Sequence, residues 1–107
     1  MTPTLRKTID ELVKLDLQRH EISTGGSIDH SIFLPDPVER LLATLSQEDL
    51  IYVKALLHYG RGDLEHDTPF SKYLESATKT LNDGSVAYLA GKNLSVDLPA
   101  ALAKLGL

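Results

Sequence analysis

The stretch from Ser46 to Asp63, SQEDLIYVKALLHYGRGD, constrains the fold more than any other part of the chain. After a polar first turn its apolar residues are Leu50, Ile51, Tyr52, Val53, Ala55, Leu56, Leu57 and Tyr59. In a helix these side chains point in almost every direction and leave a narrow polar strip of Gln47, Lys54 and His58. A helix that is apolar on nearly every side is a buried one. We therefore predict a central buried helix over about 47–59, with the other helices packed around it.

Sequence patterns predict further helices on both sides of this central helix. Their starts are marked by capping residues, by first-turn prolines or by acidic residues, and their ends by glycines. The predicted segments are a helix beginning at Thr2-Pro3, a helix over 37–45 capped by Asp36, the central helix capped by Ser46, a helix from Asp67-Thr68-Pro69 to Asn82-Asp83-Gly84, a short one over 85–90, and a last one from Ser95 or Asp97 to Leu105. Strand patterns are nearly absent. We predict one all-α domain over residues 1–107, a compact bundle of about five to six helices, with an irregular loop over about 21–35.

One charged residue interrupts the apolar stripe of the first helix. That stripe consists of Leu5, Ile9, Leu12 and Val13, and Asp16 falls near its centre. Either the helix frays or turns away at Asp16, or the carboxylate points inward toward a partner. We favour the first interpretation, because Leu15 and Leu17 flank Asp16 and the stripe can simply drift.

The turn from His58 to Asp67 holds two histidines, three carboxylates and one arginine within ten residues. We expect Gly60 to end the central helix in the left-handed conformation, with Gly60 and Gly62 forming a structural turn. One hypothesis makes Arg61 and Asp63 ligand-binding residues, with Arg61 anchoring a carboxylate or phosphate beside the free N–H groups of the turn. The alternative, which we favour, is that Arg61 pairs with a neighbouring acid such as Asp63 or Glu65.

A second hypothesis for the same turn is a divalent metal site using His58, Asp63, His66 and Asp67. Imidazole and carboxylate groups suit zinc, iron or manganese. The spacing matches neither HExxH nor an EF-hand, and acidic residues near helix starts are expected as caps. We rank this site below a structural turn. We predict no cofactor and recognise no catalytic set of nucleophile and base.

Composition argues against several classes of partner. The net charge is −4, with 15 acidic against 11 basic side chains, so a nucleic-acid partner is not expected. The tight turn between 37–45 and 47–59 suits a helix-turn-helix protein, but Lys54 is the only basic residue that its second helix could present to bases. There is no apolar run long enough for a membrane span, no signal-peptide pattern and no cysteine. We therefore expect a cytoplasmic protein without a membrane partner.

Three motifs within residues 36–63 are similar to those of a bacterial protein family. They are Asp36-Pro37-Val38-Glu39, the run Leu45-Ser46-Gln47-Glu48-Asp49 followed by Ala55-Leu56, and Gly60-Arg61-Gly62-Asp63, the most specific of the three. Ala87-Tyr88-Leu89 before Gly91, and a terminal helix ending Leu105-Gly106, extend the similarity. Over about residues 36–107 the chain resembles the bacterial domain-of-unknown-function family numbered 3775. The resemblance implies a helical bacterial domain and implies no activity.

The function expected from the sequence is binding of another protein or of a second copy of the chain, as an interaction or regulatory module. The central helix has more apolar faces than a small bundle easily covers, so a homodimer could bury the remainder. The alternative is a binding protein or an enzyme that takes a small molecule or a divalent metal through the 58–67 turn.

Overall fold

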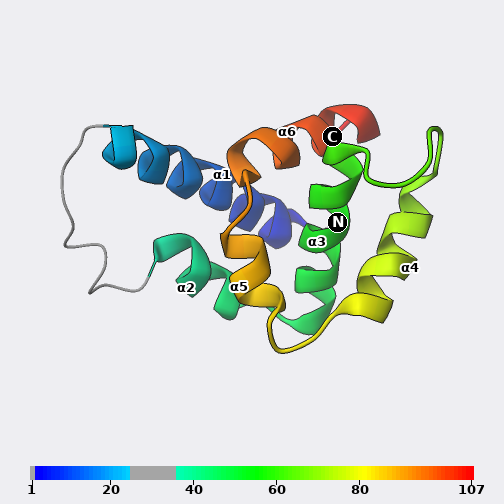
Figure 1. Ribbon diagram of the computed structural model, residues 1–107, viewed down its shortest axis with the longest axis horizontal. Coiled ribbons are helices and arrows are strands. Elements are labelled where there is room, and N and C mark those ends of the chain that lie inside the picture. Colours follow the sequence, from blue (N-terminus) through cyan, green and yellow to red (C-terminus); the bar gives the residue numbers. More distant parts are fainter. Residues whose placement is uncertain (1, 25–35) are drawn as a thin grey trace.

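The computed structural model describes residues 2–24 and 36–107, and this part of the chain contains six helices and no strand (Figure 1). The helices are α1 (Pro3–Thr24), α2 (Pro37–Ala43), α3 (Gln47–Arg61), α4 (Phe70–Thr80), α5 (Ser85–Ala90) and α6 (Leu94–Leu105). The predicted all-α class is confirmed. Of the loop expected over 21–35, residues 21–24 belong to α1, and 25–35 lie outside the described residues. None of the described helices combines the length and the apolar character needed to cross a membrane.

Helix α3 stands at the centre of the bundle, with α6 and α4 as its main neighbours (Figure 1). Leu56 and Leu57 belong to a large apolar cluster shared with α1, α2, α5 and α6. On another side of α3, Ala55 packs with Tyr73 and Ala77 of α4 in a smaller cluster. Burial from several sides explains why α3 is apolar around most of its circumference, as predicted.

The two predicted caps around α2 are confirmed. Oδ1 of Asp36 accepts a hydrogen bond from the Val38 N–H at 2.9 Å, and Oγ of Ser46 accepts one from the Asp49 N–H at 3.2 Å. Each cap satisfies a backbone donor that has no partner within its helix. Helix α2 ends at Ala43 rather than at residue 45, so a short connection separates it from α3.

The prediction that Gly60 ends the central helix is wrong. Helix α3 continues to Arg61, and Gly62 adopts the left-handed conformation with φ 70°. Gly60 is needed for another reason, because a Cβ atom there would overlap the carbonyl oxygen of Asp97 and lie 3.0 Å from its carbonyl carbon. The missing side chain at Gly60 therefore lets the backbone of α6 lie directly against α3.

The favoured interpretation of Asp16 is also wrong, because its side chain is fully buried. Oδ2 of Asp16 accepts a hydrogen bond from the Ser95 N–H at 2.8 Å, in the first turn of α6. The side chain of Asn93, which precedes α6, makes no capping hydrogen bond. Asp16 therefore caps α6 from α1, and α6 begins at Leu94, before either start that the sequence suggested.

Helix α4 begins at Phe70, after the predicted Asp67-Thr68-Pro69 start. Pro69 occupies the cap position without a side-chain hydrogen bond, and Asp67 has a positive φ of 66° in the preceding turn. Helix α5 covers 85–90 and stops at Gly91, as predicted.

Candidate functional site

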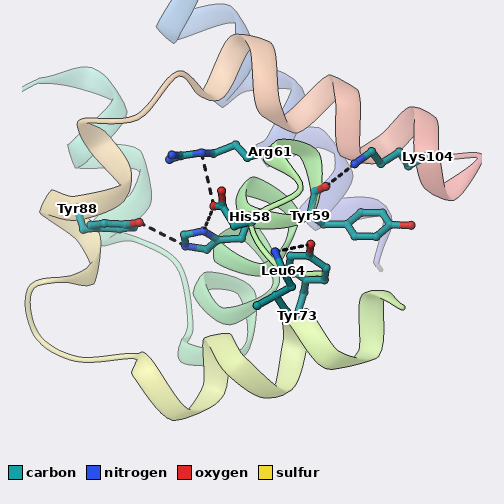
Figure 2. Close-up of polar contacts among 8 residues, drawn as sticks. His58, Tyr59, Arg61, Leu64, Tyr73, Tyr88 and Lys104 are labelled. Atoms are coloured by element: carbon teal, nitrogen blue, oxygen red, sulfur yellow. Dashed lines mark hydrogen bonds and ion pairs between the residues drawn. The ribbon is translucent and has the colours of Figure 1, made fainter. Parts of the chain in front are cut away.

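The C-terminal end of α3 brings His58 and Asp63 together (Figure 2). After Gly62 reverses the chain, the Asp63 N–H donates to the carbonyl oxygen of His58 at 3.1 Å. This turn returns the Asp63 side chain to α3, where its Oδ2 accepts a hydrogen bond from Nδ1 of His58 at 2.6 Å. Lys104 of α6 secures the same helix end, because its Nζ donates to the carbonyl oxygen of Tyr59 at 2.8 Å. The backbone thus holds the imidazole and the carboxylate in a defined orientation.

Tyr88 of α5 lies on the other side of the His58 ring (Figure 2). Its hydroxyl oxygen is 3.4 Å from Nε2 of His58, and the two rings are stacked with centroids 6.0 Å apart. Because Nδ1 donates to the carboxylate of Asp63, Nε2 of a neutral imidazole is the acceptor nitrogen, and the Tyr88 hydroxyl donates to it. Asp63, His58 and Tyr88 therefore form one polar chain.

Lys54 lies one turn before His58 on the same strip of α3 and is 8% exposed. Its Nζ donates to the carbonyl oxygen of Thr80 at the end of α4, at 3.2 Å, and lies 5.5 Å from the centroid of the Tyr88 ring. Within the described part of the chain, no carboxylate lies within ion-pair distance of this ammonium group. Burial lowers the pKa of Lys54 below its ordinary value, because a low-dielectric surrounding disfavours the charged form.

These side chains border a cavity of about 560 Å³ between α3, α4 and α5, which we call the α3–α4–α5 cleft. The polar groups on its wall include Lys54, His58, Asp63, Tyr73, Ser85 and Tyr88. The volume falls within the range of about 300–1,000 Å³ typical of small-molecule sites. The cleft therefore has both the size and the convergent polar groups of a binding site.

The two predicted ligand-binding residues, Arg61 and Asp63, lie against each other. Nε of Arg61 is 3.5 Å from Oδ2 of Asp63, the oxygen that also accepts from His58 (Figure 2). This is the ion pair of the structural alternative. Both side chains also act on Asp97 of α6: burial raises the pKa of Asp97, Arg61 opposes this rise and Asp63 adds to it.

The four predicted metal ligands are not brought to one place. His58 pairs with Asp63, whereas Nε2 of His66 lies 3.5 Å from Oδ1 of Asp67, and both of these side chains are almost fully exposed. Among the residues that the structure describes, there is no group of three histidine or carboxylate side chains arranged to hold a metal ion.

Sequence reasoning identified His58 and Asp63 but missed three of the residues that complete the cleft: Lys54, Tyr73 and Tyr88. Lys54 carried a usable signal, because it shares a polar strip with His58 on an otherwise apolar helix. Tyr73 and Tyr88 carried none, because they come from α4 and α5 and look like ordinary core residues in sequence.

These observations define the chain as an all-α domain with a polar cleft beside its central helix. No family model, curated protein or solved structure matches the chain. The resemblance of residues 36–107 to the bacterial family numbered 3775 therefore stays a prediction. Its most specific motif has a physical role in this fold, because Gly60 admits α6, Gly62 reverses the chain and Asp63 orients His58.

Proposed function

We propose that this protein is a small-molecule-binding domain and that its ligand occupies the α3–α4–α5 cleft. The observation that carries the proposal is the convergence of polar side chains from three helices and the 62–69 turn on one cavity of ligand size. His58 is held by Asp63 on one side and meets Tyr88 on the other, so its ring is positioned before any ligand arrives. A site with fixed polar groups loses little entropy on binding.

The protein-interaction function expected from the sequence stays a prediction, but less exposed apolar surface supports it than the sequence suggested. It rested on surplus apolar surface of α3, but Leu57 is fully buried within one chain and Tyr52 is partly buried. Helices α4 and α6 cover much of the surface that a second copy was expected to cover. This is why the cleft, rather than self-association, is the function that we put forward.

Filling the cleft tests the proposal. Ser76 and Ser71 are both exposed serines on α4, but only Ser76 lines the cleft. A screen of small compounds by nuclear magnetic resonance should give ligands that perturb the signals of His58 and Tyr88. Ser76→Trp should abolish these perturbations, and Ser71→Trp should leave them unchanged. Ligands that bind Ser76→Trp as well as they bind the wild type would contradict the proposal.

A further inference from the structure

We propose that the ligand of the α3–α4–α5 cleft carries an oxyanion, either a carboxylate or a phosphate group, that pairs with the ammonium group of Lys54. This inference rests on the proposed function and adds the chemical class of the ligand. It starts from Lys54, a buried cation that borders the cleft.

Among the residues that the structure describes, no carboxylate balances the charge on Lys54. A buried ammonium group is costly unless it is paired, and the only hydrogen-bond acceptor that Lys54 has in the described structure is the neutral carbonyl oxygen of Thr80. An ammonium group has three N–H donors, so this bond leaves two of them for another acceptor. An anion in the cleft would supply both the missing charge and the missing acceptors.

The carboxylate that borders the same cleft does not fill this role. Oδ2 of Asp63 accepts from Nδ1 of His58 at 2.6 Å and lies 3.5 Å from Nε of Arg61. The guanidinium group of Arg61 offsets the negative charge of Asp63, which reduces its repulsion of an anionic ligand. Among the described residues that border the cleft, the carboxylate of Asp63 is already engaged and the ammonium group of Lys54 has no carboxylate within ion-pair distance.

Two buried hydroxyl groups, those of Tyr73 and Ser85, add donors to the same cleft. The oxygen of Tyr73 accepts a hydrogen bond from the Leu64 N–H at 2.9 Å, and Oγ of Ser85 accepts one from the Asn82 N–H at 3.0 Å. Because each oxygen accepts in these bonds, its own proton is available to donate. An oxyanion, which accepts several hydrogen bonds at once, is the chemistry that such a set of donors recognises.

The test compares anion binding by the full chain and by lysine variants. Inorganic phosphate and succinate serve as separate probes for the phosphate and the carboxylate arm, at constant ionic strength set with sodium chloride. Binding is followed by the nuclear magnetic resonance signals of Tyr88 and His58. Lys54→Met removes the proposed cation, and Lys14→Met removes an exposed lysine from α1 with the same change in net charge.

We expect at least one probe to perturb these signals in the wild type. Lys54→Met should weaken its apparent affinity about tenfold or more, Lys54→Arg should retain part of it, and Lys14→Met should change it by less than about twofold. Phosphate also has a general salt effect on protein stability, which does not depend on binding in the cleft. That effect is the same for the wild type and the three variants, so it cannot produce a difference in affinity between them. If Lys54→Met does not fold, Lys54→Arg and Lys14→Met are each compared with the wild type instead. An equal loss of apparent affinity in these two variants overturns the proposal.

Failure of this proposal is distinguishable from failure of the proposed function. The oxyanion proposal is overturned if neither probe perturbs Tyr88 and His58, or if Lys54→Met binds as tightly as the wild type. If neutral or cationic compounds nevertheless enter the cleft and Ser76→Trp excludes them, small-molecule binding stands and only the ligand class is wrong. If no compound of any charge enters the cleft, both proposals fall.

Discussion

At the scale of single residues, Asp16 shows how one carboxylate can join two distant parts of the chain. Its Oδ2 caps the first turn of α6 from α1, across 79 residues of sequence. Asp16→Ala should lower the free energy of unfolding by about 1–3 kcal/mol, because it leaves a partly buried N–H group of Ser95 without its acceptor. Chemical denaturation monitored by circular dichroism measures this loss.

Asp10 on the same helix is the matched control for Asp16. It is paired with Arg6 at 3.2 Å, but its side chain is 62% exposed. Asp10→Ala should therefore cost only about 0.3–0.5 kcal/mol, the usual value of an exposed pair one turn apart. Asp16→Asn, which keeps an acceptor oxygen, should fall between the two alanine variants. Equal losses for Asp10→Ala and Asp16→Ala would show that the cap contributes nothing.

Because Lys54 is buried, the stability of the folded chain should depend on pH through its ammonium group. Below the folded-state pKa, the ammonium is charged in both the folded and the unfolded chain, so folding bears the full cost of burying it. As the pH rises through the lowered pKa toward the ordinary value of 10.5, the folded chain loses the proton first and this cost falls. The stability of Lys54→Met relative to the wild type should therefore decrease as the pH rises.

Urea denaturation between neutral pH and about pH 10 measures this trend for Lys54. Lys14→Met serves again as the control, because Lys14 is exposed on α1 and its removal relieves no burial. A difference between Lys54→Met and the wild type that is constant across this range would mean that the ammonium group is not buried in solution.

At the scale of helices, local sequence was enough to predict the elements but not how they meet. The caps Asp36 and Ser46 were predictable because each bonds to an N–H group within a few residues. Asp16 and Gly60 were misjudged because their roles depend on α6, which the local pattern does not reveal. An aspartate on an apolar stripe and a glycine near a helix end have common local explanations, and only tertiary contact decides between them.

The contact of α3 with α6 predicts an unusual order for the loss of stability when three glycines are replaced by alanine. Gly60→Ala should cost about 3 kcal/mol, because its Cβ meets the backbone of Asp97, which cannot rotate away. Gly62→Ala should cost about 1–2 kcal/mol, because alanine is strained at φ 70° although the space is open. Gly91→Ala, with no atom closer than 3.7 Å to the added Cβ, should stay within about 0.5 kcal/mol.

Thermal or urea denaturation of the three variants tests this order. Without α6, Gly60→Ala would stabilise the interior of a helix by about 1 kcal/mol, so the sign alone is informative. A variant at Gly60 that is more stable than the wild type would show that α6 does not lie against α3 in solution.

At the scale of the whole molecule, the fold was predictable and the site only partly so. The sequence pattern identified the central helix because a buried helix carries apolar residues in every turn. The cleft has no comparable pattern in the sequence, because Lys54, Tyr73 and Tyr88 lie on different helices and come to one cavity only when the helices pack. His58 and Asp63 were found because one turn contains both residues, although the sequence did not indicate that they bond to each other.

The homodimer expected from the sequence now makes a sharper prediction. Within one chain Leu57 is fully buried, whereas Leu17 and Val96 are 52% and 65% exposed. Each of these two residues follows a member of the hydrogen bond between Asp16 and Ser95, which brings α1 and the start of α6 together. Leu17 and Val96 are therefore exposed apolar side chains on two helices that meet, and if a dimer buries them, their joint replacement by glutamate should separate its subunits. Sedimentation equilibrium at roughly tens of micromolar decides this: the wild type must show twice the 11.7 kDa chain mass and the double variant a single chain mass. A wild-type monomer would leave the cleft as the basis for function.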